Sequence, residues 1–375
     1  MRRTISSSLG SSFTKRTIAI LAIAAVFGVL LAVSTVTSAG PGTTEDVGRD
    51  PSAVESGIGP APFFNHQGPG ANFIKAGVTT RVYNTWTNSQ TEPFVLTVPV
   101  LPAGAVVVET FISWNYLLNG AAPANDAITV NGFAANGGLV GSGSPDLCWG
   151  KDGVASYVVA GATPWVNPGP APINVTITGA TDKAVGADNN AYGEGLTILV
   201  VYEVPGDPWH NVDLYCGYTS NMSNPTGLAF ATLNYTVQYE GGDFHFFVNG
   251  LDGQIAPDDF LIDGVIRSGA VNGTVAVGDA WQGLLGPSAS GVDNMYDHAN
   301  DDISAFLPTP DASLDISTTA GPGDCIGHSF AAVSFPAERR IPTLTEWGMI
   351  IFCVLLFGWM AWVIVRRRKR VTIRA

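Results

Sequence analysis

Positively charged residues are scarce in this chain of 375 residues. It contains 18 Lys and Arg against 31 Asp and Glu. Most of the basic residues lie near the two ends, which leaves 8 between residues 40 and 340, against 30 acidic residues and a formal charge of −22 there. A field of this sign repels polyanions, so nucleic-acid binding is excluded as the main activity.

Histidine and cysteine are also rare, with 5 and 4 residues. No two histidines lie three or four residues apart, which is a common spacing in zinc sites. One cysteine lies in an apolar stretch near the C-terminus, and an oxidising compartment would let the other three form one disulfide. Three pairings are open among Cys148, Cys216 and Cys325. The Cys148–Cys216 pairing is preferred, because it would close the first of two units predicted below.

Outside two apolar segments near its ends, the chain has no long stretch with a helical period. Short runs rich in β-branched and aromatic residues alternate instead with turn residues, among them 44 Gly and 24 Pro. Such runs are typical of strands. They include residues 94–100, 105–116, 128–131, 173–178, 196–204, 228–239, 244–248, 312–316 and 329–335. The pattern predicts an all-β fold, built as a β-sandwich or jelly roll.

A faint internal repeat divides this β-rich region in two. Each copy contains a strand that ends in a polar residue and a glycine, Asn131-Gly132 in the first copy and Asp263-Gly264 in the second. Each copy then closes with a strand, a Gly-rich turn and a buried apolar strand. The repeat predicts two β-sandwich (jelly-roll-like) units, over residues 71–207 and 208–337.

The N-terminal residues have the layout of a secretory signal. Four basic residues precede an apolar run over residues 18–33, and small residues follow. This order predicts a signal peptide over residues 1–39, cleaved after Ala39. An uncleaved N-terminal anchor is the alternative, and both interpretations export the residues that follow. Residues 40–70 are rich in Gly, Pro, Ser and acidic residues and are predicted to form a flexible linker, with an N-terminal strand at its end as one option.

Residues 338–375 combine a short motif, an apolar span and a basic cluster. Residues 348–365 carry no charge and reach the lower length limit for a transmembrane helix. The basic tail, residues 366–375, should stay in the cytoplasm, which leaves the preceding chain outside. Its orienting residues are Arg366, Arg367, Arg368, Lys369 and Arg370. Span and charges alone are equally compatible with a plain tail anchor.

The residues before the span add a specific resemblance. Residues 341–348 read IPTLTEWG and closely resemble the IPTL-type C-terminal sorting domain of Gram-negative bacteria. The residues that carry the resemblance are Ile341, Pro342, Thr343, Leu344, Trp347 and Gly348. It implies that a membrane-embedded exosortase recognises the signal and processes the chain during export to the cell envelope. The chain would then be the substrate of an enzyme rather than an enzyme.

The middle of the chain also resembles a β-rich surface domain of unknown function from archaeal and bacterial envelope proteins. The resemblance rests on residues 192–195, which lead into residues 199–203, and on residues 301–303. It implies a β-sandwich fold and a surface location, and it brings no catalytic residues with it.

The sequence contains no complete catalytic motif. Residues 286–291 are one residue too long for the turn that carries a serine nucleophile. Cys325 and His328 would need a lowered thiol pKa, for which no neighbouring residue accounts. The adjacent pairs Asp258-Asp259 and Asp301-Asp302 are candidates for a glycosidase-like site, although turns are their expected place.

Calcium is the one candidate cofactor, because a dense acidic segment could supply the oxygen ligands that this ion prefers. The candidate ligands are Asp293, Asp297, Asp301 and Asp302. The spacing does not fit an EF-hand loop, and a solvated acidic loop is the alternative.

A glycan is the one candidate ligand among organic molecules. Several tryptophans fall in or beside predicted loops, where they would form a binding platform or cap the ends of a sandwich. They are Trp86, Trp149, Trp165, Trp209 and Trp281.

Together these features predict an exported, non-enzymatic protein of the cell envelope or the extracellular space, with a structural, adhesive or matrix role. Its expected partners are the secretion machinery, an exosortase, and the membrane through the C-terminal helix. The precursor is expected in the inner membrane with its ectodomain outside, and the product at the cell surface or beyond it. The alternatives are a surface carbohydrate-binding module and a secreted hydrolase with an unrecognised carboxylate pair.

Overall fold

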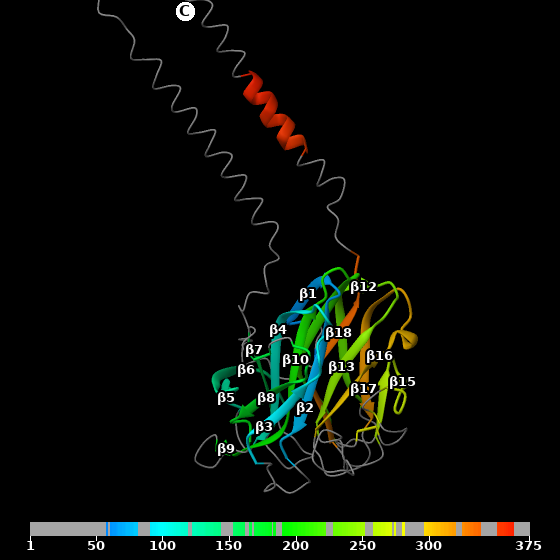
Figure 1. The fold of residues 1–375 in the computed structure, drawn as a ribbon. Coiled ribbons are helices and arrows are strands. Elements are labelled where there is room, and N and C mark those ends of the chain that lie inside the picture. Colours follow the sequence, from blue (N-terminus) through cyan, green and yellow to red (C-terminus); the bar gives the residue numbers. More distant parts are fainter. Residues whose placement is uncertain are drawn as a thin grey trace, which may run out of the picture. The chain divides into compact units, whose positions relative to one another are not determined.

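The structure of the chain is a computed structural model. It describes residues 58, 61–81, 91–118, 122–143, 153–161, 165–166, 169–181, 183–184, 190–222, 228–251, 258–271, 274, 280–281, 296–319, 325–338 and 351–363. The chain divides into two compact units, Met1–Pro336 and Ala337–Ala375. Strands in three sheets build the first unit, which confirms the predicted all-β class (Figure 1).

The largest sheet has nine strands and follows the order β2-β10-β4-β7-β6-β5-β8-β3, with β9 paired to β10. Its strands are β2 (Asn72–Thr79), β3 (Phe94–Val98), β4 (Val106–Leu118), β5 (Asn125–Val130), β6 (Phe133–Gly143), β7 (Gly153–Gly161), β8 (Ile173–Thr178), β9 (Lys183–Ala184) and β10 (Asn190–Glu203). The end strands β2 and β3 contact each other, so the sheet curls back on itself.

The second half of the unit forms two smaller sheets. A five-stranded sheet has the order β1-β11-β18-β13-β16, and a four-stranded sheet has the order β12-β17-β14-β15. Their strands are β1 (Phe64–Pro69), β11 (Trp209–Met222), β12 (Leu228–Tyr239), β13 (His245–Leu251), β14 (Asp259–Ile262), β15 (Val265–Ile266), β16 (Tyr296–Asp302), β17 (Asp311–Thr319) and β18 (Cys325–Pro336). A short 3-10 helix, η1 (Ser304–Phe306), follows β16.

One strand order occurs twice along the chain. In the first half, β2-β10-β4-β7 form one four-strand row and β3-β8-β5-β6 form another. In the second half, β11-β18-β13-β16 and β12-β17-β14-β15 repeat both rows strand for strand, and β1 adds one strand to the edge. The eight strands β2–β8 and β10 therefore share one β-sandwich-like topology with the eight strands β11–β18, in two antiparallel layers.

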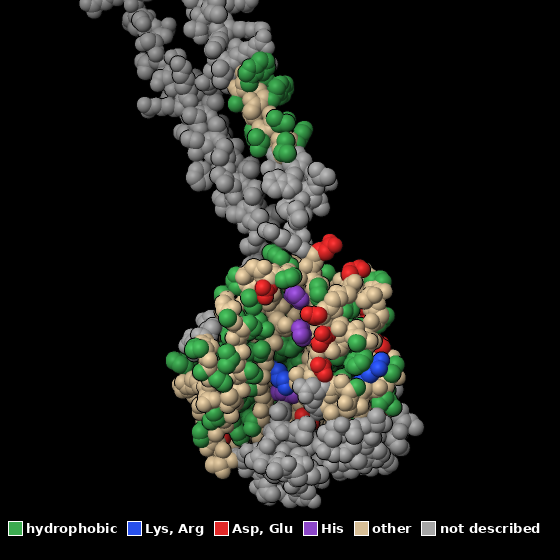
Figure 2. Space-filling view, turned by 45° about the vertical axis from the view of Figure 1, so that its right-hand side comes forward, with side chains coloured by type: hydrophobic (Ala, Val, Ile, Leu, Met, Phe, Trp, Pro, Cys, Tyr) green, Lys and Arg blue, Asp and Glu red, His purple; other side chains and the backbone are tan. Residues whose placement is uncertain are grey.

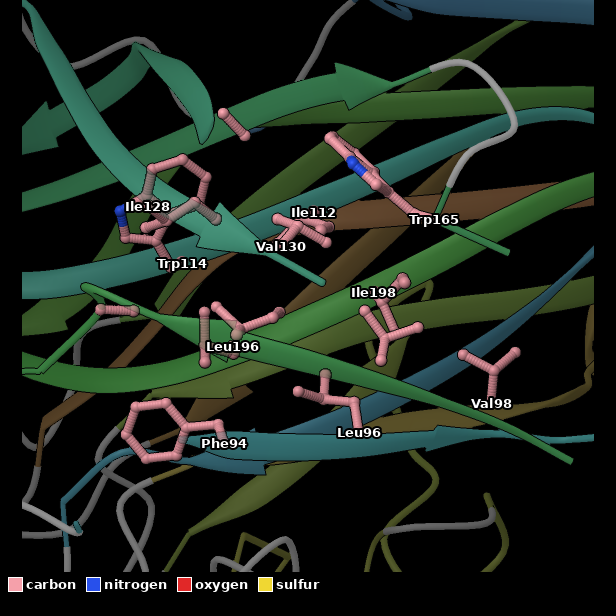
Figure 3. Close-up of a cluster of buried hydrophobic side chains, with 14 of the residues drawn as sticks. Phe94, Leu96, Val98, Ile112, Trp114, Ile128, Val130, Trp165, Leu196 and Ile198 are labelled. Atoms are coloured by element: carbon pink, nitrogen blue, oxygen red, sulfur yellow. The ribbon is translucent and has the colours of Figure 1, made fainter. Parts of the chain in front are cut away.

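Each half buries its own apolar core between its two rows. The first core unites alternate residues of β3, β4, β5, β8 and β10, among them Leu96, Trp114 and Leu196 (Figure 3). The second core joins the five-stranded and four-stranded sheets through residues such as Phe246 and Ile316. Because successive side chains on a strand point to opposite faces, the long strands can also bury a second face.

A third core fills the space between the two halves. It contains Phe111 and Leu199 from the nine-stranded sheet and Leu214, Phe247 and Phe330 from the five-stranded sheet. These residues occupy the strand faces that point away from the first and second cores. The two halves are thus joined by a continuous apolar layer, which explains why residues up to Pro336 form one compact unit.

Two hairpins mark the repeat that is faintly visible in the sequence. Asn131 and Gly132 join β5 to β6 with φ angles of 50° and 83°, and Asp263 and Gly264 join β14 to β15 with 49° and 73°. Two consecutive positive φ angles favour a polar residue followed by glycine. The backbone N–H of Asn131 donates to the β8 strand, and that of Asp263 donates to the β17 strand. The predicted correspondence of these two turns is confirmed.

The predicted flexible linker over residues 40–70 ends in ordered structure. Strand β1 lies inside that range and pairs with β11 from the second half of the unit. Phe63 and Phe64 pack against the third core. The strand is the option that the sequence left open, and the partial burial of two aromatic side chains favours it over the turn-forming composition around them.

In the second unit, residues 351–363 form a helix. Its large apolar side chains are exposed, including Phe352, Val354 and Leu355 at 62–66%. In the part of the chain that the structure describes, no helix is both long and apolar enough to cross a membrane. The predicted span of residues 348–365 extends past the described helix at both ends.

Candidate functional site

Buried polar side chains gather where the nine-stranded sheet faces the five-stranded one. They form a hydrogen-bonded chain across the third core, which we call the seam network. Its members are Lys75, Asn115, Ser156, Thr197, Asn249, Tyr296, His298 and Ser329. They come from strands of both halves, so the network is made only when the halves pack together.

Asn249 on β13 makes the most hydrogen bonds in this network. Its Nδ2 donates to Ser329 Oγ at 2.8 Å and to Tyr296 Oη at 3.0 Å. Its Oδ1 accepts from the backbone N–H groups of Ser329 and Phe330, both at 2.9 Å. The side chain thus satisfies two buried backbone donors on β18, which would otherwise cost free energy.

Asn115 on β4 connects this group to the first half. Its Oδ1 accepts from Ser156 Oγ on β7 and from Ser329 Oγ on β18, both at 2.7 Å. The two asparagines lie on β4 and β13, which hold the same place in the repeated strand order. Both hydrogen-bond to Ser329. These hydrogen bonds fix the position of β4 relative to β13 and β18, because sliding one half past the other would leave buried donors unpaired.

Tyr296, Thr197 and His298 continue the network toward the edge strand β2. Thr197 Oγ1 lies 2.7 Å from Tyr296 Oη and 2.7 Å from His298 Nε2. Burial raises the pKa of Tyr296 to about 12 and holds the pKa of His298 well below its usual value, with the neighbouring Lys75 charge as a smaller cause. Both side chains are therefore neutral near pH 7.

Lys75 lies at the outer end of the network, on β2. Its Nζ is 3.1 Å from His298 Nδ1 and 6.0 Å from the centre of the Phe247 ring. Burial lowers the pKa of Lys75 to about 8, and the nearby Asp297 carboxylate opposes that shift only in part. Figure 2 shows basic, acidic and histidine side chains gathered on one face of the β-rich unit.

A buried ion pair lies in the same half of the molecule. Arg81 Nη2 donates to Glu194 Oε1, and both side chains are fully buried. Arg81 follows the end of β2, and Glu194 lies on β10. The hydroxyl of Thr79, the last residue of β2, donates to the backbone carbonyls of both residues. Separating the two residues would leave an uncompensated charge in the interior, so the ion pair holds the end of β2 against β10.

Two of the three predicted cysteines lie in the described residues, at different positions along the paired strands β11 and β18. Cys216 lies on β11, half-buried beside the third core. Cys325 begins β18, and its backbone pairs with Met222 near the end of β11. Cys148 lies outside the described residues, so the Cys148–Cys216 pairing stays a prediction.

The predicted calcium ligands do not lie on one loop. Asp297, Asp301 and Asp302 belong to β16, which pairs with β13, and Asp293 lies outside the described residues. Asp301 and Asp302 are adjacent on a strand and so point to opposite faces. Asp302 accepts from the backbone N–H groups of Ser304 and Phe244. Within the described ranges, no three His, Cys, Asp or Glu side chains are placed to hold a metal ion.

The other candidates for chemistry serve local structure. Asp258 is buried and accepts from the backbone N–H groups of Ala280 and Trp281, while Asp259 accepts from Ser268 Oγ. His328 is also buried, with Nδ1 2.6 Å from the Asn249 carbonyl and Nε2 2.8 Å from Thr318 Oγ1. Burial lowers the pKa of His328 to about 4.

Two of the five candidate tryptophans lie in the cores. Trp281 is fully buried in the second core, and Trp165 is 7% exposed in the first. Neither can belong to an exposed glycan platform, because their rings fill the interior. Trp209 is half-exposed at the start of β11, and Trp86 and Trp149 lie outside the described residues.

The sorting signals lie outside the residues that the structure describes. This holds for Ala39, for the motif residues 341–348 and for the basic residues 366–370. Their roles therefore stay predictions from the sequence. The seam network, in contrast, was not predicted. One signal for it exists in the sequence, because Lys75 interrupts an otherwise uncharged strand in a region with very few lysines.

Comparisons with known proteins give little further information. No family model matches the chain, and no curated protein is similar to it in sequence. Among solved structures, it is similar to the major capsid protein P2 of bacteriophage PM2, with 10% identity over 72% of this chain and 99% of that one, at a TM-score of 0.22. It is also similar to the Sputnik virophage structure, with 8% identity over 73% and 86% of the chains and a TM-score of 0.17. Scores this low carry no argument about function.

Proposed function

We propose that this chain is an exported, non-enzymatic protein of the bacterial cell envelope, which an exosortase processes at its C-terminal sorting signal. The mature product is a pair of jelly-roll-like β-sandwich units, over residues 71–207 and 208–337, with a structural, adhesive or matrix role. The repeated strand order supports the division into two units.

The observation that carries this proposal is the character of the C-terminal helix. Residues 351–363 read IFCVLLFGWMAWV, and most of their large apolar side chains are exposed. Such a surface is unfavourable in water and favourable in a bilayer. The motif IPTLTEWG ends two residues before it and the basic run begins two residues after it, in the order that a sorting signal needs. The last strand, β18, ends at Pro336, so the motif follows the β-rich unit without interrupting it.

The interior of the β-rich unit supports a structural role. The buried polar side chains of the seam network donate to and accept from one another across the two halves. The carboxylates of Asp258 and Asp302 hold backbone N–H groups. A protein that must persist outside the cell gains from such internal satisfaction of polar groups.

Point variants in the sorting motif test the proposal in a host that carries an exosortase. Pro342→Ala and Trp347→Ala should leave the full-length precursor in the inner membrane, whereas the natural chain should appear as a shorter, released or surface-bound product. Thr345→Ala is the matched control, since Thr345 lies inside the stretch but outside the residues that carry the resemblance, and it should be processed normally. Intact-protein mass and cell fractionation measure both.

Two results would contradict the proposal. One is an unchanged mass and location when residues 341–375 are deleted. The other is equal processing of Pro342→Ala, Trp347→Ala and the natural chain. A glycan array with the full chain tests the alternative role as a carbohydrate-binding module. Specific binding to a glycan would support that role, and binding no higher than background would exclude it.

A further inference from the structure

Lys75 differs from an ordinary surface lysine in where its amine lies. It is on β2, the edge strand of the nine-stranded sheet, and its backbone pairs with Leu199 on β10. The side chain is half-buried, because β16 of the second half contacts β2. The amine thus lies at the boundary between the two halves, where it keeps partial access to solvent.

The groups that face this amine come from three strands. His298 Nδ1 on β16 is 3.1 Å away, the Phe247 ring on β13 lies at 6.0 Å, and Asp297 supplies a nearby carboxylate. On β10, Thr197 is uncharged and holds His298 Nε2 at 2.7 Å. The environment is mostly apolar or neutral, so it favours an uncharged amine over an ammonium ion.

The donor capacity of the Lys75 ammonium gives a direction to its contact with the imidazole, because an ammonium only donates. His298 is fully buried and neutral, so one of its ring nitrogens carries a proton and the other accepts. With the proton on Nε2, facing Thr197 Oγ1, Nδ1 is the acceptor that faces Lys75. An N–H of the amine then points at Nδ1, and the nitrogen lone pair of the neutral amine stays available to an electrophile.

We propose that Lys75, held by His298 at the boundary between the two halves, is a nucleophilic amine that captures small aldehydes as imines. The neutral amine adds to the carbonyl carbon, which forms the C–N bond while the carbonyl oxygen becomes a hydroxyl. The proton that the nitrogen loses reaches that oxygen through solvent, to which the half-buried amine keeps partial access. Loss of the hydroxyl as water then leaves the imine, so one amine and one aldehyde give one imine and one water, with no change in oxidation state.

Two features of the site restrict what can react. The half-buried side chain and the strands beside it admit a small carbonyl compound more readily than a bulky one. His298 is fully buried and stays neutral, so it orients the amine without taking a proton from it. The lowered pKa of Lys75, about 8, supports the same conclusion, because about a quarter of an amine with this pKa is neutral at pH 7.5, against about one in a thousand for an ordinary lysine.

The test uses the purified full chain, glycolaldehyde as the probe, and borohydride to trap the imine as a stable amine. Peptide mass spectrometry then measures labelling at each lysine. Lys151 and Lys183, the other two lysines between residues 40 and 340, are the internal references. At pH 7.5 we expect Lys75 to label about tenfold faster than either, with a rate that rises through a midpoint near pH 8. In urea the three rates should become equal.

Variants separate the roles of the two residues. Lys75→Arg keeps the charge and should lose this label alone. His298→Gln should slow the labelling of Lys75 and shift its pH midpoint, as expected of a residue that positions the amine. If His298→Gln does not fold, the dependence of the Lys75 labelling rate on pH in the natural chain still tests the proposal. Labelling of Lys75 no faster than that of Lys151 and Lys183, or a midpoint near pH 10, would overturn the proposal.

Discussion

The two halves of the β-rich unit share a strand order but close it differently. In the first half, β6 runs over Phe133–Gly143 and pairs with both β5 and β7, so the two rows join into one curled sheet. In the second half, the corresponding strand β15 is Val265–Ile266 and, within the part of the chain that the structure describes, pairs with β14 alone, so the rows are two sheets there. The length of a single strand therefore decides whether one topology gives a continuous sheet or a sandwich with an open side.

The open side has consequences for how the second half is stabilised. More of the buried polar side chains in the described residues belong to it, and so do both buried histidines there, His298 and His328. Its core is closed by Trp281, which packs against Phe260 and His328. The second half thus relies on specific side chains where the first relies on continuous backbone pairing. The predictions below test this contrast.

The largest difference is expected from the two buried tryptophans. Trp281→Ala should lower the free energy of unfolding by about 4 kcal/mol, and Trp165→Ala by about 3 kcal/mol, because the first ring is fully buried and the second lies at the edge of its core. Urea unfolding of the purified chain measures both values. A larger loss for Trp165→Ala would show that the first half depends on its tryptophan as much as the second does.

The two asparagines of the seam network should also differ. Asn249→Ala removes the acceptor for two buried backbone N–H groups and should cost about 3 kcal/mol. Asn115→Ala leaves two hydroxyl groups, of Ser156 and Ser329, which can rotate to other acceptors, so about 1 kcal/mol is expected. Equal losses in urea unfolding would contradict the assignment of Asn249 as the main link within the network.

Acid should weaken the second half before the first. The pKa of His328 is about 4 in the folded chain and near 6.5 when unfolded, so the folded state resists protonation. The contribution of His328 is therefore constant above pH 7, and it lowers stability as the pH drops from 6.5 to 4, by about 3 kcal/mol in total. Burial lowers the pKa of His298 as well, in the same direction.

Hydrogen exchange measured at pH 7, 5 and 4 can locate this loss. Peptides from β16 and β18 should lose protection first, and those from β4 and β10 later. The variant His328→Gln should be less stable at pH 7 than the natural chain. The protection of its β18 peptides from exchange should depend less on pH. Loss of protection in both halves at the same pH would mean that the histidines do not set the acid response.

Much of the fold can be predicted from the sequence, and the reason is local. Alternating apolar residues in stretches such as residues 94–100 and 173–178 specify strands, because one face must be buried. The strands β6 and β7 lack the alternation that marks a half-buried strand, because β6 is Gly-rich and β7 is buried on both faces over residues 155–158. Residues 297–302 were expected in a loop, because acidic residues seldom occur in strands, yet pairing with β13 overrides that preference.

The candidate site could not be predicted in the same way. Lys75, Thr197 and His298 are far apart in the sequence, and only the packing of the two halves brings them together. Nothing in the local pattern around Asn249 marks it as a residue that caps two backbone groups of β18. To predict a site that is formed by contacts between repeats, the packing of the repeats must be known. Composition and periodicity do not give that packing.

The smallest expected effects concern the two hairpins of the repeat. Gly132→Ala and Gly264→Ala should each cost about 1 kcal/mol, because both glycines have positive φ angles that an L side chain resists. The cost in the first half should exceed that in the second, since β6 continues into pairing with β7, whereas β15 ends after two residues. Thermal unfolding of the purified chain measures both variants. A larger cost for Gly264→Ala would mean that the short hairpin, rather than Trp281 and the buried histidines, holds the open side of the second half together.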